Sequence, residues 1–250
     1  MADALGYDPD VELRPGWHLR CHPVVRRLTC RALLEDPELI AEFDGFIAAC
    51  TPGMVLLDLG AHFGLFSLAA LHFGGADARA VAVDPSATSV KMLRRMVRLN
   101  RMEHRVRVIR AAATAEEGEV ELVDAGVFAA GFFVHPDAAH PASERTTATG
   151  VTVDGLCRRL GLRPTHLKID VEGFEVEILR GAQETLRASP RPLVFIELHN
   201  AMVRGHGGDN AAAIRELQDA GYTLFQVDGS PASAGSLLQC DLVHVVAKPP

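Results

Sequence analysis

From residue 54 onward, short apolar runs alternate with longer amphipathic stretches, and this alternation limits the fold more than any other feature of the chain. The apolar runs predict strands at residues 54–59, 80–83, 106–109, 166–169 and 193–198. The stretches between them predict helices at residues 64–73, 87–100, 154–160 and 173–188. Strands that alternate with helices pair in parallel, and the helices cover both faces of the sheet. We therefore predict an α/β protein built on a parallel sheet.

The two ends of the chain depart from this alternation. Asp36-Pro37 offers a helix N-cap and is followed by apolar residues at helical spacing, so we predict an N-terminal helical appendage or lid over residues 1–50. Residues 51–250 would form the main domain. Near its end, residues 222–227 and 242–246 are two strands with no room for a long helix between them, which indicates an antiparallel hairpin. Residues 124–150 show no regular period and predict a long loop, a second candidate lid.

Composition argues against several classes of protein. The net charge of −7 disfavours a nucleic-acid binder, which needs surplus cations to displace phosphate counterions. No apolar run reaches the ~18 residues of a membrane helix, and the polar N-terminus is unlike a signal peptide. The five cysteines form no CxxC pair, so we expect neither a disulfide framework nor a zinc site, and we predict a cytoplasmic protein. The oligomeric state stays open, with a homodimer as one option.

A glycine turn follows the first strand of the main domain, in the order Asp58-Leu59-Gly60-Ala61-His62-Phe63-Gly64. Gly60 permits a tight turn and a close approach of the backbone to a ligand, and Gly64 lies where the next helix packs on the sheet. The spacing differs from that of the GxGxxG phosphate cradle and suits a ligand with an amino-acid tail and no phosphate. Asp84-Pro85 ends the second strand, where a carboxylate can accept hydrogen bonds from both ribose hydroxyls. Ligands of open parallel sheets bind at such strand ends, so we predict a site for S-adenosylmethionine.

A second group of polar residues lies at the ends of the fourth and fifth strands. It comprises four carboxylates, one lysine and one histidine: Lys168, Asp170, Glu172, Glu175, Glu197 and His199. Asp170 and His199 are the best candidates for a general base, since an unperturbed histidine has a pKa of about 6.5. Lys168 is expected to pair with a carboxylate such as Glu197 and hold the site together. Glu172 and Glu175 lie at a helix N-terminus, where a capping role and a catalytic role are both open.

The chain resembles the FkbM family of methyltransferases in the segments "LLDLGAHFG", "AVDPS", "VTVDGLCRRLG", "HLKIDVEGFEVEILRGA" and "FIELH", which span residues 52–199. The resemblance implies a Rossmann-like class I methyltransferase fold with a mostly parallel seven-stranded sheet. It also implies that S-adenosylmethionine binds at Asp58, Gly60, Ala61, His62, Gly64, Asp84, Pro85 and Ala112. The chain departs from the family where it has His62 in place of Asn and Asp84 in place of Glu. Residues 112–115 also lack the acidic residue common there, so adenine recognition would rest on backbone groups near Ala112.

The resemblance implies an O-methyltransferase, and we expect it to act on a hydroxyl of a small specialised metabolite, of polyketide or sugar type. The catalytic residues would be Asp170, His199, Lys168 and Glu197. Nitrogen or carboxylate acceptors, and a non-catalytic binding protein with this fold, remain alternatives. We assign no metal ligand. Magnesium held by Asp170, Glu197 and His199 stays an open alternative, although histidine is an uncommon ligand for that ion. Trp17, His18 and His22 are candidates to roof the acceptor pocket.

Overall fold

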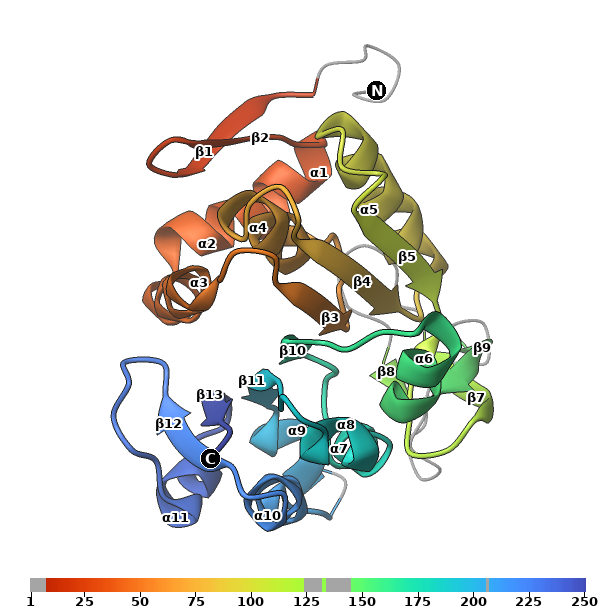
Figure 1. Ribbon diagram of the computed structural model, residues 1–250, viewed down its shortest axis with the longest axis vertical. Helices are drawn as coiled ribbons and strands as arrows, with labels where there is room; N and C mark the ends of the chain where they lie inside the picture. The colour runs from red at the N-terminus through yellow and green to blue at the C-terminus, as the bar shows by residue number, and fades with distance from the viewer. Residues whose placement is uncertain (1–7, 124–131, 134–144, 206) are drawn as a thin grey trace.

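A computed structural model describes residues 8–123, 132–133, 145–205 and 207–250 (Figure 1). The N-terminal elements are β1 (Asp10–Arg14), β2 (Trp17–Arg20), α1 (Pro23–Val25), a π-helical segment (Arg26–Cys30), α2 (Arg31–Glu35) and α3 (Pro37–Ala49). The next elements are β3 (Val55–Leu59), α4 (Leu65–Phe73), β4 (Arg79–Asp84), α5 (Ala87–Leu99) and β5 (Val106–Arg110). These are followed by β6 (Ala112–Ala113), β7 (Gly118–Val123), β8 (Phe132–Phe133), β9 (Arg145–Val151), α6 (Val153–Leu160) and β10 (His166–Ile169). The chain continues with α7 (Glu175–Arg180), α8 (Gln183–Arg187), β11 (Leu193–Leu198), α9 (Asn200–Gly205), α10 (Ala211–Asp219), β12 (Thr223–Gln226), α11 (Ala234–Gln239) and β13 (Val243–Lys248).

A seven-stranded sheet lies at the centre, in the order β12-β13-β11-β10-β3-β4-β5. The pairs β11/β10, β10/β3, β3/β4 and β4/β5 are parallel, whereas β13 runs antiparallel to both of its neighbours. This confirms the predicted mostly parallel sheet and its antiparallel C-terminal pair. The chain builds outward from β3 to β5 and then returns to the other side of β3 with β10. The strand order therefore reverses between β3 and β10, and the carboxyl ends of these strands form the expected crevice.

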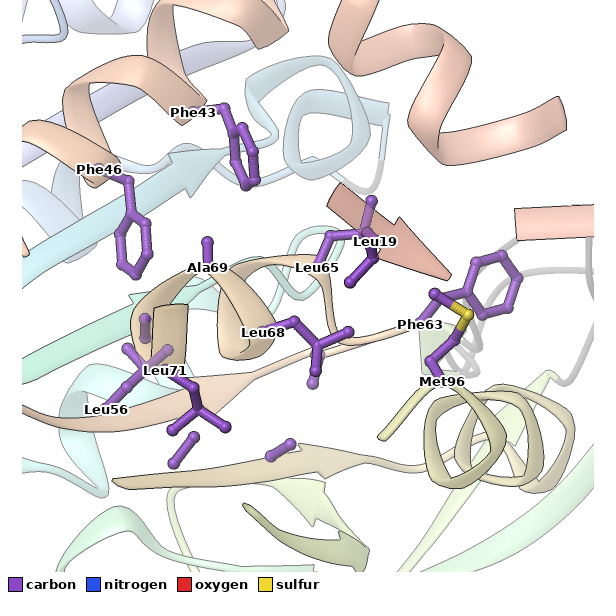
Figure 2. Packing of buried hydrophobic residues seen from close by; sticks show 14 of the residues in the cluster. Leu19, Phe43, Phe46, Leu56, Phe63, Leu65, Leu68, Ala69, Leu71 and Met96 are labelled. Carbon is purple, nitrogen blue, oxygen red and sulfur yellow. The ribbon is translucent and has the colours of Figure 1, made fainter. Parts of the chain in front are cut away.

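Two apolar clusters pack on the two faces of the sheet. One contains side chains of α3, α4 and α5 together with Leu56 and Phe195, and it includes the labelled residues of Figure 2. The other contains side chains of α6, α7, α8 and α10 together with Leu57 and Ile169. Leu56 and Leu57 are neighbours in β3 and face opposite clusters, as the two-residue period of a strand requires. Both faces of the sheet are thus covered. In the described chain, no helix is long and apolar enough to span a membrane.

The N-terminal segment is helical only in part. Its first elements, β1 and β2, form an antiparallel hairpin that the sequence analysis did not predict. Trp17 of β2 is buried and stacks on Phe43 of α3 at 6.0 Å between ring centroids. The predicted helix after Asp36 is confirmed as α3, and Asp36 Oδ1 accepts hydrogen bonds from the backbone of Glu38 and Leu39. The segment therefore packs into the same core as the sheet.

The central region differs from prediction in two places. Residues 145–150, expected in a loop, form most of β9, which pairs with β7 and β6 in a second, four-stranded sheet. Much of the remaining candidate lid, residues 124–131 and 134–144, lies outside the described residues. The single helix predicted over residues 173–188 is instead two short helices, α7 and α8. They separate at Gly181, where a Cβ would lie 2.2 Å from the backbone oxygen of Thr114.

Candidate active site at the carboxyl ends of the central strands

Two cavities meet at the point where the strand order reverses. The larger has a volume of about 120 Å³ and is lined on the sheet side by predicted site residues: Asp58, Gly60, Ala61, His62, Lys168, Asp170 and Glu197. The smaller, of about 20 Å³, is lined by Gly60, Asp84, Pro85, Ala112, Asp170 and others. Gly60 and Asp170 line both. The fold thus brings together residues from four strand ends.

The glycine turn after β3 has the conformation that its sequence predicts. Gly60 has a φ of 79°, and a Cβ there would lie 1.7 Å from the backbone oxygen of Asp170. Glycine is therefore required both by the left-handed backbone and by the close approach of the next strand. Gly64 has a φ of 80°, and its missing side chain leaves room for Leu93 of α5. Gly64 thus allows the turn to pack against α5, and it lines neither cavity.

Asp84 ends β4 and organises the loop beside it. Its carboxylate accepts hydrogen bonds from the backbone N–H groups of His62 (2.8 Å) and Ser86 (2.9 Å). His62 takes a left-handed conformation with a φ of 47°, which is uncommon for a residue other than glycine. Its Nε2 atom is buried and makes no hydrogen bond within the described residues. Such an unsatisfied polar atom beside a cavity is a group that a bound ligand can satisfy.

Asp58 lies in β3 at the floor of the larger cavity. The hydroxyl of Ser67 in α4 donates a hydrogen bond of 2.6 Å to its Oδ2 atom. Burial raises the pKa of Asp58 to about 6, although this hydrogen bond opposes the shift. Asp58 is therefore a buried carboxyl that is close to its protonation point near neutral pH.

Lys168 is surrounded by carboxylates, as predicted, but its closest partner comes from the N-terminal segment. Its Nζ lies 2.8 Å from Oε1 of Glu42 in α3, and 3.7 Å from both Oδ2 of Asp170 and Oε2 of Glu197. Burial alone would lower the pKa of Lys168, but these carboxylates outweigh burial and raise it. For Glu42, burial alone would raise the pKa, but the charge of Lys168 outweighs burial and holds this pKa at about 2. Both groups are therefore charged.

The carboxylate of Glu175, whose role the sequence left open, contacts the imidazole ring of His199. The Nδ1–H group of His199 donates to Oε1 of Glu175 over 2.7 Å, and the backbone N–H of Gly173 donates to the same oxygen over 3.0 Å. Glu175 is completely buried. The other ring nitrogen, Nε2, lies 3.8 Å from Oδ1 of Asp170 and 3.7 Å from Oε1 of Glu197. The carboxylate therefore directs Nε2 toward the two acids.

The protonation states differ from those expected for unperturbed side chains. Burial lowers the pKa of His199, but the hydrogen bond to Glu175 and the charge of Asp170 outweigh burial and raise this pKa to about 9. Burial and the charge of Asp170 raise the pKa of Glu197 to about 7, although Lys168 opposes the shift. At neutral pH His199 is therefore a cation, and it is Glu197 that is poised to take up or release a proton. The pKa of His199 thus lies above the ordinary histidine value of about 6.5, because its neighbours are acidic.

Ligand atoms of Asp170, Glu197 and His199 lie within 4.8 Å of one another, as a metal site requires. A second trio with the same spacing consists of Glu42, Glu197 and His244 of β13. The ammonium group of Lys168 contacts carboxylates of both trios: Asp170 and Glu197 in the first, and Glu42 and Glu197 in the second.

Sequence reasoning missed Glu42 and His244. Glu42 interrupts the apolar face of α3 between Leu39 and Phe43, and this position was the available signal. His244 Nδ1 lies 3.3 Å from Oε2 of Glu42. Trp17 and His18, expected to roof the pocket, lie elsewhere: Trp17 is in the core, and the His18 ring lies next to Asp10 and Glu12. The roof consists instead of Thr29, Ala32, Leu33 and Leu39.

Comparisons with known proteins find several similar solved structures. One similar solved structure is a precorrin-6y C5,15-methyltransferase from Geobacter metallireducens GS-15, with 15% identity, a TM-score of 0.49, and coverage of 87% of this chain and 91% of that chain. Another is fibrillarin from Aeropyrum pernix with natively bound S-adenosyl-L-methionine, with 14% identity, a TM-score of 0.46, and coverage of 82% and 76%. A third is an S-adenosylmethionine-dependent methyltransferase from Aquifex aeolicus, with 14% identity, a TM-score of 0.45, and coverage of 86% and 94%. No curated protein sequence matches the chain.

The sequence model of the methyltransferase FkbM domain matches residues 58–224, which is more than half of the chain. The matched region begins at Asp58 and includes the glycine turn, Asp84, the Lys168–Glu175 segment and His199. This chain therefore belongs to the FkbM family and is a methyltransferase of the S-adenosylmethionine-dependent kind.

Proposed function

We propose that the protein transfers a methyl group from S-adenosylmethionine to a hydroxyl of a small specialised metabolite, of polyketide or sugar type. The observation that carries this proposal is the position of Glu197. It is a buried carboxyl with a pKa of about 7 that lines the larger cavity next to the predicted cofactor site. An aliphatic hydroxyl has a pKa of roughly 16, so its attack on a methyl group needs a base.

The residues around the two cavities suit the cofactor. Asp84 and Pro85 would meet the ribose, backbone near Ala112 would meet the adenine, and Asp58 with the Gly60–His62 turn would meet the amino-acid tail. When bound, S-adenosylmethionine supplies an activated methyl group on a sulfonium ion. The buried Nε2 atom of His62 supports this assignment, because it lacks a hydrogen-bond partner within the described residues.

Within this proposal Glu197 accepts the proton of the acceptor hydroxyl. His199 acts as the partner of that base rather than as the base itself, since it is protonated at neutral pH and lies 3.7 Å from Oε1 of Glu197. Asp170 lines both cavities and would orient the hydroxyl toward the methyl group. The four apolar or weakly polar residues of the roof would contact the body of the acceptor.

Calorimetry with S-adenosylmethionine and with S-adenosylhomocysteine tests the cofactor. We expect the parent to bind both, and Asp84→Asn to bind about 10- to 100-fold more weakly, because a charged acceptor becomes neutral. Asp44→Asn, which changes an exposed carboxylate on α3, is the matched control. Absence of binding by the parent would refute the proposal.

Mass spectrometry with a trideuteromethyl cofactor then tests the acceptor on a panel of hydroxylated small molecules. Fragmentation of the product distinguishes methylated oxygen from nitrogen or carboxylate. An amine acceptor is the second candidate, because carboxylates outnumber cations among the described residues that line the larger cavity. The carboxylates are Glu42, Asp58, Asp170 and Glu197, and the basic groups are Lys168 and the weakly basic His62. A product methylated only on nitrogen would refute O-methylation and support methyl transfer to an amine.

A further inference from the structure

The ammonium group of Lys168 is buried at a junction of four elements. Lys168 is only 1% exposed. Its Nζ contacts Glu42 of α3 on one side, Asp170 and Glu197 on a second, and the ring face of Phe66 of α4 at 4.9 Å on a third. Carboxylates and an aromatic face are the groups that stabilise a desolvated cation. The pocket around Nζ is therefore built for a positive charge.

Lys168 and His199 share the same two acids. Asp170 presents Oδ2 to Lys168 at 3.7 Å and Oδ1 to His199 Nε2 at 3.8 Å. Glu197 presents Oε2 to Lys168 at 3.7 Å and Oε1 to His199 Nε2 at 3.7 Å. The four groups thus form a closed ring in which cations and anions alternate. This ring fixes the orientation of both carboxylates at the edge of the larger cavity.

The same atoms would otherwise suit a divalent metal ion. Asp170, Glu197 and His199 bring a ligand atom each within 4.8 Å of one another, and Glu42, Glu197 and His244 do the same. Carboxylates with imidazole are ligands for Mn²⁺ and related ions. A metal ion bound by either trio would lie beside Nζ, and the like charges would repel strongly in a buried setting. A divalent metal ion in addition to the Lys168 ammonium group is therefore incompatible with this arrangement.

We propose that Lys168 is the resident cation of this site, and that its ammonium group, held between Glu42, Asp170 and Glu197, excludes a divalent metal ion from the two adjacent trios. Lys168 is then a positioning residue: it acts on the reaction through the two carboxylates that it orients. The role of Lys168 in catalysis rests on the proposed methyl transfer. The exclusion of a metal ion by Lys168 does not depend on that proposal.

The test removes the ammonium group and asks whether a metal replaces it. We expect Lys168→Met to bind one Mn²⁺ at least about tenfold more tightly than the parent, measured by electron paramagnetic resonance of free Mn²⁺ during titration. Lys91→Met, which removes an exposed lysine of α5, should behave like the parent. Adding Glu42→Gln or Asp170→Asn to Lys168→Met should weaken Mn²⁺ binding again, because each removes a carboxylate ligand.

Activity supplies a second readout. Methyl transfer by the parent should be insensitive to EDTA, whereas Lys168→Met should lose activity and recover part of it on addition of Mn²⁺. Thermal unfolding and binding of S-adenosylhomocysteine show whether Lys168→Met is folded. A folded Lys168→Met that binds Mn²⁺ no better than the parent would overturn the inference.

The parent tests the inference even if Lys168→Met does not fold. Tight Mn²⁺ binding by the parent that disappears in Asp170→Asn would also overturn the inference, because the site would then hold a metal beside Lys168. Absence of cofactor binding by the parent, in contrast, would refute the proposed function and leave the Mn²⁺ result standing.

Discussion

At the scale of single residues, the proposed chemistry depends on side chains whose pKa values in the fold differ from their ordinary values. His199 and Glu197 both have a raised pKa, of about 9 and about 7. A raised pKa means that the folded protein binds the proton more tightly than the unfolded chain does. The protonated form therefore stabilises the fold at low pH, and this contribution is lost as the pH rises through the pKa of the folded state.

Glu175→Gln tests the origin of the raised His199 pKa. Without the carboxylate, the pKa of His199 should fall by about one unit or more, and the free energy of unfolding should fall by about 1–3 kcal/mol at pH 6. The destabilisation should be largest below about pH 6.5, the pKa of an unfolded histidine, and should shrink as the pH approaches 9, the value in the parent. Histidine proton resonances give the pKa, and urea unfolding gives the free energy. An unchanged pKa would contradict the assignment of Glu175 as its main favourable partner.

Glu197→Gln tests the proposed base. We expect kcat to fall by ~10²- to 10⁴-fold with cofactor binding retained. In the parent, kcat/KM should decline below about pH 7 as Glu197 takes up a proton, and this decline should be absent in the variant. Glu177→Gln, which changes an exposed carboxylate on α7, is the matched control. Full activity in Glu197→Gln would transfer the role of base to another group.

Two glycines allow the cost of a left-handed backbone to be measured separately from the cost of a steric clash. Gly60 and Gly75 have nearly the same φ, 79° and 78°, but only Gly60 has a neighbour where a Cβ would lie. Gly75→Ala should lower the free energy of unfolding by about 1–2 kcal/mol, the cost of a left-handed conformation. Gly60→Ala should lower it by clearly more, because the backbone of Asp170 must move. Equal effects in thermal unfolding would show that the close approach is easily relaxed.

At the scale of elements, the sequence predicted the strands of the central sheet better than the helices around it. The strands are short apolar runs whose ends carry distinctive polar residues such as Asp58 and Asp84. The break between α7 and α8 was not visible in the apolar pattern, because its cause lies in another part of the chain. The carboxylate of Asp154 in α6 accepts hydrogen bonds from the backbone of Glu184 and Thr185, at the start of α8. A distant side chain thus serves as the cap.

The N-terminal cover (residues 26–49) lies over the larger cavity. The two cavities measure about 120 and 20 Å³, well below the roughly 300–1,000 Å³ of a typical ligand site. The cavities must therefore widen to admit the cofactor, and we predict that the cover moves. We expect bound S-adenosylhomocysteine to change amide hydrogen exchange in residues 26–49, measured by mass spectrometry, while β12 and β13 stay unchanged. Binding without any change in the cover would show that the cavities widen elsewhere.

At the scale of the whole molecule, residues 8–50 share one core with the sheet. Leu19 of β2 and Phe43 and Phe46 of α3 pack in the same cluster as Leu56 of β3 (Figure 2). Removal of residues 1–50 would uncover part of this face of the sheet and also free Lys168 from Glu42. We expect a fragment of residues 51–250 to lose cooperative thermal unfolding, because it lacks large buried side chains such as Trp17, Phe43 and Phe46. Each such side chain contributes about 1.5–3 kcal/mol, against a typical stability of ~5–15 kcal/mol. A cooperative transition in circular dichroism would instead support an independent domain boundary at residue 50.

The sequence by itself determined the sheet, the family and the location of the candidate site, because strand periodicity and strand-end residues are local patterns. Asp58, Gly60, Asp84, Asp170 and Glu197 meet because parallel strands end at one edge. Only the tertiary structure decided which groups carry charge and which orient them. Glu42 reaches Lys168 from 126 positions away in the chain, and Glu175 fixes His199 across 24. A pKa depends on burial and on charges gathered from distant segments, so no local pattern could assign the proton to Glu197.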